Sequence, residues 1–199
     1  MFSFDIYKVL KVLFIFFCFI PSLSHAHLFQ GEAGGFMTGF EHPLTGLDHL
    51  LAMFSVGLWG AQMGGRSVWT FPVTFPLIMV LGGFMGIAGI PLPNVELGIA
   101  LSIVVLGSAI VFSWKPSEWL ALALICVFAI CHGYAHGTEL PKATAPADYA
   151  LGFVIATGMI HILGIGVGLL SQKILLGKLT RLLGSFVVLG GVYFLVMAL

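Results

Sequence analysis

The sequence predicts an all-α integral membrane protein, a compact bundle of six transmembrane helices that follows a cleaved signal peptide. The first observation is composition: of 199 residues, 59% are hydrophobic and 8% are charged, and the mean hydropathy is +1.11. Soluble domains do not have this composition. Secondly, apolar runs of about 18 to 22 residues recur with short connections between them. Thirdly, the first 26 residues have the layout of a secretory signal.

The signal is read from three features in order. Two lysines precede an apolar run at 12–20, and small residues around Ala26 provide a cleavage site. The run is shorter than the ~20 residues that a membrane span needs, which favours cleavage over an uncleaved first helix. The chain then divides into a signal peptide at 1–26 and a membrane domain at 27–199, with His27 as the mature N-terminus.

The mature chain contains six apolar segments long enough to cross a bilayer. They run approximately at 44–63, 68–90, 94–113, 117–137, 147–170 and 180–199. A cleaved signal exports the N-terminus, and most basic residues then fall in cytoplasmic loops, as the positive-inside rule requires. These residues are Arg66, Lys115, Lys173, Lys178 and Arg181, with Lys142 outside. We therefore expect a multi-pass protein of a bacterial-type inner (plasma) membrane, with its mature N-terminus outside.

Charge and motifs exclude several classes of partner. The formal net charge is zero, so no basic surface is available for nucleic acid. No glycine-rich phosphate loop of the Walker type is present, which argues against direct use of ATP. Once the signal is removed, Cys126 and Cys131 remain, and their spacing on one helix disfavours a disulfide. Cys131 is either a buried free thiol or a soft metal ligand beside His132.

The first polar motif is His42-Pro-Leu-Thr-Gly-Leu-Asp48-His49. His42 and His49 are seven positions apart, which predicts two turns on one helical face. Pro43 suits a first helical position, and Thr45 with Asp48 has the form of a capping box. Asp48 is therefore a metal ligand, a partner that orients a ligating histidine, or a helix cap.

The second polar motif is His132-Gly-Tyr-Ala-His136-Gly-Thr-Glu139. His132 and His136 are four positions apart on one helical face, a common arrangement for holding a metal, and Glu139 falls on the same side. The alternative is a pair of ordinary buried histidines. Gly133 and Gly137 would allow a neighbouring helix to approach closely. The predicted topology brings both motifs to the outer side of the membrane, which predicts one shared site.

Two further histidines are weaker candidates for metal contact. His161 lies near the middle of the fifth predicted span, where it is either a second station for a metal or a structural hydrogen-bonding group. His27 would offer its imidazole and the free amine as an outer ligand. Ionisable groups inside a bilayer are expensive and usually functional. Imidazole and carboxylate donors together indicate a site or path for a divalent transition metal.

The two motifs, with the cleaved signal and six spans, resemble the HupE/UreJ hydrogenase and urease accessory family over the whole chain. The family has an aromatic residue before the second motif, where this chain has Cys131. The resemblance implies a secondary permease for nickel, or cobalt in some members. It implies no fixed cofactor, with Ni²⁺ or Co²⁺ as the transported substrate. Metal contact would then come from the following residues: His42, Asp48, His49, His132, His136 and Glu139, with His27 and His161 less central.

Three other functions remain open at this point. A membrane-embedded zinc-dependent hydrolase would use the same ligands with Glu139 as general base. A non-transporting metal sensor or accessory protein would bind the ion without moving it. A haem protein would use paired axial histidines, although the carboxylates beside the imidazoles speak against haem. The sequence does not determine the oligomeric state, nickel versus cobalt, or uniport versus proton exchange.

Overall fold

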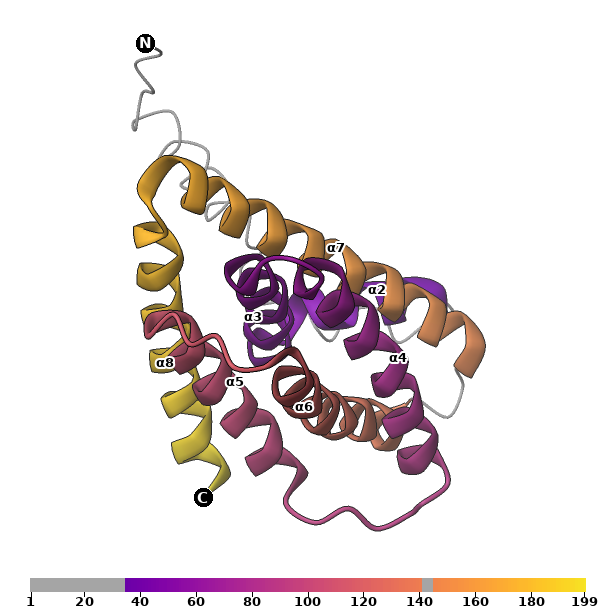
Figure 1. Cartoon of the computed structure of the whole chain (residues 1–199). Helices are drawn as coiled ribbons and strands as arrows, with labels where there is room; N and C mark the ends of the chain where they lie inside the picture. Colours follow the sequence, from indigo (N-terminus) through magenta and orange to yellow (C-terminus); the bar gives the residue numbers. More distant parts are fainter. Residues whose placement is uncertain (1–34, 141–144) are drawn as a thin grey trace. The chain divides into compact units, whose positions relative to one another are not determined.

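The computed structural model describes residues 35–140 and 145–199, and every regular element within them is a helix. The predictions on the signal peptide and on His27 lie outside the described residues. The helices follow one another through short connections (Figure 1). Their bounds are α2 Phe36–Thr45, α3 Leu47–Met63, α4 Ser67–Ile87, α5 Val95–Val111, α6 Glu118–Glu139, α7 Pro146–Leu175 and α8 Lys178–Ala198.

Four of these helices, α4, α6, α7 and α8, are long and apolar enough to cross a membrane. The apolar helix α5 has 17 residues, as does α3, and at 1.5 Å per residue each is about 25 Å long. Each of the six predicted spans coincides with a helix. The described residues therefore have the architecture of a multi-pass helical membrane protein. The fifth predicted span is extended to 30 residues in α7.

Large apolar side chains point outward from several helices. On α4, Trp69 and Phe84 are 64% and 65% exposed, and on α8 the exposed fraction of Leu189 is 67%. In water, such faces would be contiguous apolar patches of the kind that mark a contact surface. On helices of membrane length, they are the surface that lipid chains cover.

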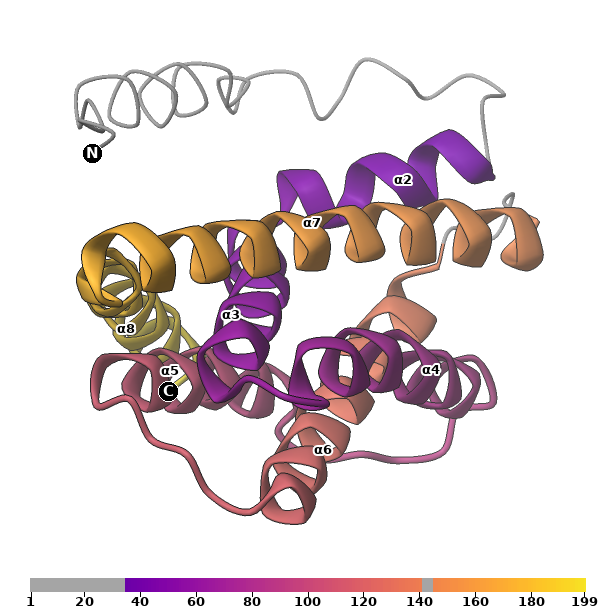
Figure 2. The ribbon, with the colours of Figure 1, turned by 45° about the horizontal axis from the view of Figure 1, so that its top comes forward.

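Glycines set the distance between paired helices. A Cβ atom on Gly133 of α6 would collide with the backbone of Met79 on α4, and one on Gly137 would collide with Gly83. The two helices therefore pack backbone to backbone, as the small-residue pattern around the second motif predicted. The same relation holds between α3 and α7, α2 and α7, and α5 and α8, through the glycines Gly57, Gly164, Gly39, Gly152, Gly107, Gly184 and Gly191. Figure 2 shows α2 lying alongside α7.

The start of the first span differs from the prediction. Pro43 lies inside α2 instead of at a first helical position, and α3 begins only at Leu47, after Gly46 adopts an extended conformation with φ −79° and ψ 107°. The predicted capping box is wrong because the Thr45 hydroxyl donates to the Glu41 and His42 carbonyls at the end of α2. No side chain caps the N-terminus of α3.

Candidate metal centre

Four imidazoles from three helices meet at one place. His42 comes from α2, His49 from the first turn of α3, and His132 and His136 from α6. The ring of His136 lies 4.7 Å from that of His42 and 4.4 Å from that of His49, measured between centroids. The rings of His49 and His132 are 5.3 Å apart. The two sequence motifs are therefore in contact, as their predicted topology allowed.

The break at Gly46 brings the first two of these histidines together. His42 and His49 were predicted on one face of a single helix, and this is wrong because they belong to two helices joined at Gly46. Their ring centroids are nevertheless 6.0 Å apart. A Cβ atom on Gly46 would lie 3.2 Å from both the Asp48 carboxylate and the His49 ring, so a residue without a side chain leaves room for this pair.

Asp48 holds the His49 ring. Its Oδ1 accepts a hydrogen bond from His49 Nδ1 at 2.7 Å and another from the His49 backbone N–H at 2.9 Å. With the proton on Nδ1, the lone pair of His49 is on Nε2, which is buried and has no hydrogen-bond partner. A carboxylate in this position commonly orients a histidine toward a metal. Of the three predicted roles of Asp48, the geometry matches the orienting partner.

The histidines of α6 leave further nitrogens without partners. His132 donates from Nδ1 to the Phe128 carbonyl at 2.9 Å, and its Nε2 is buried and unpaired. His136 is 6% exposed, and neither of its ring nitrogens has a hydrogen-bond partner among the described residues. Unpaired polar atoms are costly in an apolar interior and are rare in folded proteins. A bound cation would satisfy the lone pair that each of these neutral rings carries.

The more exposed end of the cluster adds a carboxylate. His42 Nε2 lies 3.9 Å from Glu139 Oε2, and the side chain of Glu139 is 54% exposed. His42, His136 and Glu139 can each place one ligand atom within 4.8 Å of the others. Two imidazole nitrogens and a carboxylate oxygen suit a divalent transition metal. A cation that approaches from this end would meet a negative charge first.

The protonation of His42 favours ligation. This residue lies in α2, which is not one of the membrane-length helices. Burial, followed by the charge of neighbouring His49, lowers the pKa of His42 to about 4, and nearby Asp48 opposes the shift. The imidazole is therefore neutral near pH 7, the form that a metal ion requires.

A second acidic residue near this end was missed by the sequence analysis. Glu96, in the first turn of α5, is near enough to Glu139 for their carboxylates to interact electrostatically. The sequence did contain a signal for it. Glu96 is near the start of the predicted span at 94–113, and the predicted topology places that start on the same side of the membrane as both motifs. Together the two residues make the entrance more negative.

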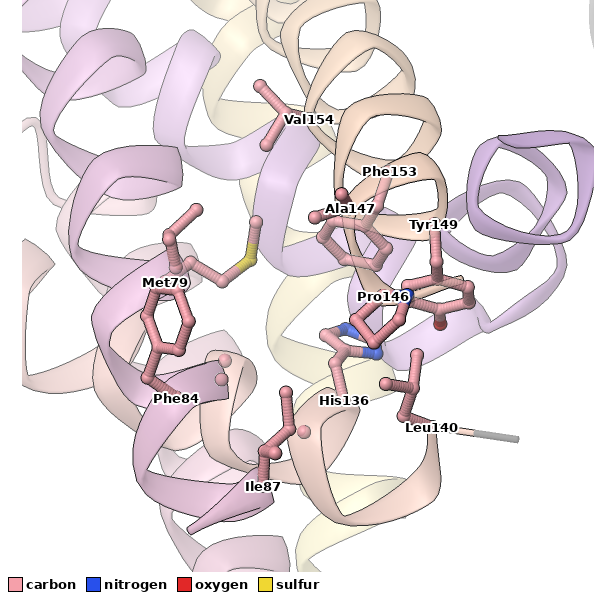
Figure 3. A pocket seen from close by; sticks show the side chains of 15 residues that line it. Met79, Phe84, Ile87, His136, Leu140, Pro146, Ala147, Tyr149, Phe153 and Val154 are labelled. Atoms are coloured by element: carbon pink, nitrogen blue, oxygen red, sulfur yellow. The ribbon is translucent and has the colours of Figure 1, made fainter. Parts of the chain in front are cut away.

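An apolar cavity of about 300 Å³ adjoins His136 between α4, α6 and α7. Figure 3 shows the His136 ring beside Tyr149 and Phe153, and the centroids of the His136 and Phe153 rings are 4.1 Å apart. Met79 and Phe84 line the opposite wall. These surroundings are almost entirely apolar, and they keep the dielectric constant around His136 low.

The remaining candidates lie apart from this cluster. The sulfur of Cys131 packs against Gly98 of α5 and is not in the group of His42, His136 and Glu139. Cys126 and Cys131 are both free thiols, as predicted. His161 is fully buried in α7, and its ring contacts Phe75 at 5.6 Å between centroids.

Fold and site together define a class: a multi-pass helical membrane protein with a buried histidine cluster beside carboxylates. The family model described as HupE / UreJ protein matches residues 15–194. Protein HupE from Rhizobium leguminosarum bv. viciae is 40% identical over 177 residues, which cover 89% of this chain and 92% of the relative. The chain belongs to the HupE/UreJ family. No solved structure matches it.

Proposed function

We propose that this protein is a secondary permease that carries Ni²⁺, with Co²⁺ as the alternative substrate, into the cell through the histidine cluster. The observation that supports it most directly is the set of unpaired buried nitrogens: His49 Nε2, His132 Nε2 and both ring nitrogens of His136. A protein that stabilised these rings only by packing would be expected to give them hydrogen-bond partners. A permeating cation supplies a partner for the lone pair of each ring during its passage.

The donor set is suited to such ions. Imidazole nitrogen and carboxylate oxygen are good ligands for Ni²⁺ and Co²⁺, whereas selection against tighter-binding copper must come from geometry. His42, His136 and Glu139, whose ligand atoms can lie within 4.8 Å of one another, would replace part of the ion's water shell. Asp48 acts through His49, which it orients, and His42 and Glu139 form the entrance.

The proposed topology has six spans, α3 to α8, in a bacterial-type inner membrane. The mature N-terminus and the Glu139 end of the cluster face outward, and the connections at Arg66, Lys115 and Lys178 face the cytoplasm. A divalent ion moving inward gains about 4.6 kcal/mol per 100 mV of inside-negative potential, which is roughly a thousandfold in accumulation. Uniport without ATP is therefore sufficient to drive uptake.

The test is uptake of radioactive Ni²⁺ into metal-depleted cells, with Co²⁺, Zn²⁺ and Cu²⁺ as competitors. A double variant, His132→Ala with His136→Ala, should lose uptake while its membrane level stays normal. Cys126→Ala provides a matched control, because Cys126 is on the same helix, half-buried and outside the cluster. Normal uptake by the double variant would rule out this path.

The competitors distinguish the substrates, and a different result would favour other functions. Competition by Co²⁺ alone at low concentration would indicate cobalt or a shared site. Absence of uptake of any metal by well-expressed protein would favour a zinc-dependent hydrolase or a non-transporting metal-binding accessory protein. An assay of metal content on the purified protein then separates a tightly held zinc from an exchangeable ion.

A further inference from the structure

A second polar site lies in the apolar interior, beyond the histidine cluster. His161, in the middle of α7, has no exposed surface, and within 35–140 and 145–199 neither of its ring nitrogens has a hydrogen-bond partner. A Cβ atom on Gly57 of α3 would meet the His161 carbonyl, so the backbones of α3 and α7 are in close contact here. Gly57 is ten residues beyond Leu47, about 15 Å along α3. His161 is therefore well below the entrance.

The neighbouring helix contributes a carbonyl that also lacks its usual partner. In α4, the carbonyl of Pro72 would normally accept from the N–H of residue 76, but residue 76 is a proline and has no N–H. This carbonyl lies beside the His161 imidazole. A carbonyl oxygen can only accept, whereas a neutral imidazole has one N–H and one lone pair. The lone pair of His161 is therefore in an apolar interior beside another acceptor, where it is costly unless something binds it.

The position of His161 continues the line of imidazoles. The Phe75 ring contacts His132 of the cluster at 5.5 Å on one side and His161 at 5.6 Å on the other, between centroids. One turn before His161 on the same face of α7, the buried Thr157 hydroxyl donates to the sulfur of Met53 at 3.3 Å. His161 is therefore separated from the cluster by a single aromatic side chain, and the hydrogen-bonded pair of Thr157 and Met53 is one helical turn away along α7.

We propose that His161 and the Pro72 carbonyl form a second, inner binding station for the divalent metal ion. The proposal rests on the proposed function, since it assigns the next stop for an ion that leaves the outer cluster. An imidazole nitrogen with an oxygen donor beside it suits a borderline transition metal better than Mg²⁺ or Ca²⁺. The neutral ring would bind the ion through its lone-pair nitrogen, and the other nitrogen would carry the N–H.

The first test replaces His161 by phenylalanine, which keeps a planar ring and removes both nitrogens. Because the ring nitrogens of His161 have no partners, this change should leave the thermal stability of the purified protein the same or raise it. Uptake of radioactive Ni²⁺ should fall by roughly tenfold or more. Equilibrium dialysis with Ni²⁺ should detect two bound ions in the wild type and one in His161→Phe. An equal number of bound ions in both would overturn the proposal.

The second test alters the carbonyl without touching His161. Pro76→Ala restores the N–H that closes the helical hydrogen bond to the Pro72 carbonyl, and uptake should fall by about three- to tenfold. Pro72→Ala is the matched control: it also removes a proline from α4, but it leaves the carbonyl of residue 72 without a partner. Uptake by Pro72→Ala should stay close to wild type. Equal losses in both variants would assign the effect to the shape of α4 and overturn the role of the carbonyl.

The two proposals fail in different ways. If wild-type protein takes up no metal, the permease function is wrong, yet the number of bound ions still tests the inner station. If the wild type transports and His161→Phe transports equally well with the same number of bound ions, the inner station is wrong and the permease function stands. Loss of uptake with one bound ion fewer, at unchanged stability, supports both.

Discussion

The carboxylate of Asp48 and the imidazole of His49 are joined by a hydrogen bond of 2.7 Å, although the two residues are adjacent in the chain. The same carboxylate oxygen also accepts from the His49 backbone N–H. These two hydrogen bonds indicate that Asp48 orients the His49 ring. They do not support the helix cap, which the sequence also allowed. It leaves Nε2 of His49 as the nitrogen available to an ion.

We expect Asp48→Asn to weaken Ni²⁺ binding by about ten- to a hundredfold, because the amide lacks the charge that favours a proton on His49 Nδ1. Protein level and thermal stability should change little, since the asparagine keeps the volume of the side chain. The measurement is the concentration dependence of Ni²⁺ uptake. Asp148→Asn, which alters an exposed carboxylate in the first turn of α7, is the control and should match wild type. Unchanged affinity in Asp48→Asn would remove Asp48 from the site.

Glu139→Gln should raise the Ni²⁺ concentration needed for half-maximal uptake by about tenfold and leave the maximal rate near wild type. The reason is that Glu139 is half exposed at the entrance, next to His42, where it captures the ion rather than holding it inside. Raising the ionic strength should narrow the difference between the two proteins. Glu41→Gln, on the exposed surface of α2, serves as the control. A lower maximal rate at unchanged affinity would place Glu139 in a later step.

Hydropathy and spacing were sufficient to locate the long helices and the face of α6 that holds His132 and His136. The reason is physical: a bilayer needs apolar runs of a fixed length, and an α-helix places residues four apart on one side. The predicted topology also allowed the contact between the two motifs, because it placed both on one side of the membrane. Close helix packing at Gly133 was predicted for the same reason, because small residues allow backbones to approach.

The break between α2 and α3 could not be predicted in this way. The helix at Phe36–Thr45 has ten residues, too few to be detected as a membrane span. The residues around Gly46 were equally compatible with the start of a single helix. The site depends on this break, because it places His42 and His49 on separate helices. Glu96 was missed because its partner, Glu139, is distant in sequence and only the fold brings them together.

Gly133→Ala should destabilise the protein by about 1 to 3 kcal/mol, because the added Cβ atom would collide with the Met79 carbonyl. Thermal unfolding in detergent measures this effect, and uptake should fall with it, since the collision lies next to His132. Gly158→Ala on α7 is the matched control: no atom lies within 4 Å of its added Cβ. A loss of stability as large in Gly158→Ala as in Gly133→Ala would mean that helix packing is not the cause.

Gly46→Ala tests whether the break itself positions the pair of Asp48 and His49. The backbone conformation of Gly46 is open to alanine, so the change should leave the folding of α2 and α3 intact. The new Cβ atom would lie 3.2 Å from Asp48 Oδ1 and from His49 Nδ1, which must move apart from it by a few tenths of an ångström. We expect Ni²⁺ affinity, measured by equilibrium dialysis, to fall by about tenfold with unchanged thermal stability. Gly166→Ala, where the added Cβ atom meets nothing within 4 Å, should bind as wild type does. If Gly46→Ala binds Ni²⁺ as tightly as that control, the site tolerates movement of His49 and the orienting role of Asp48 is contradicted.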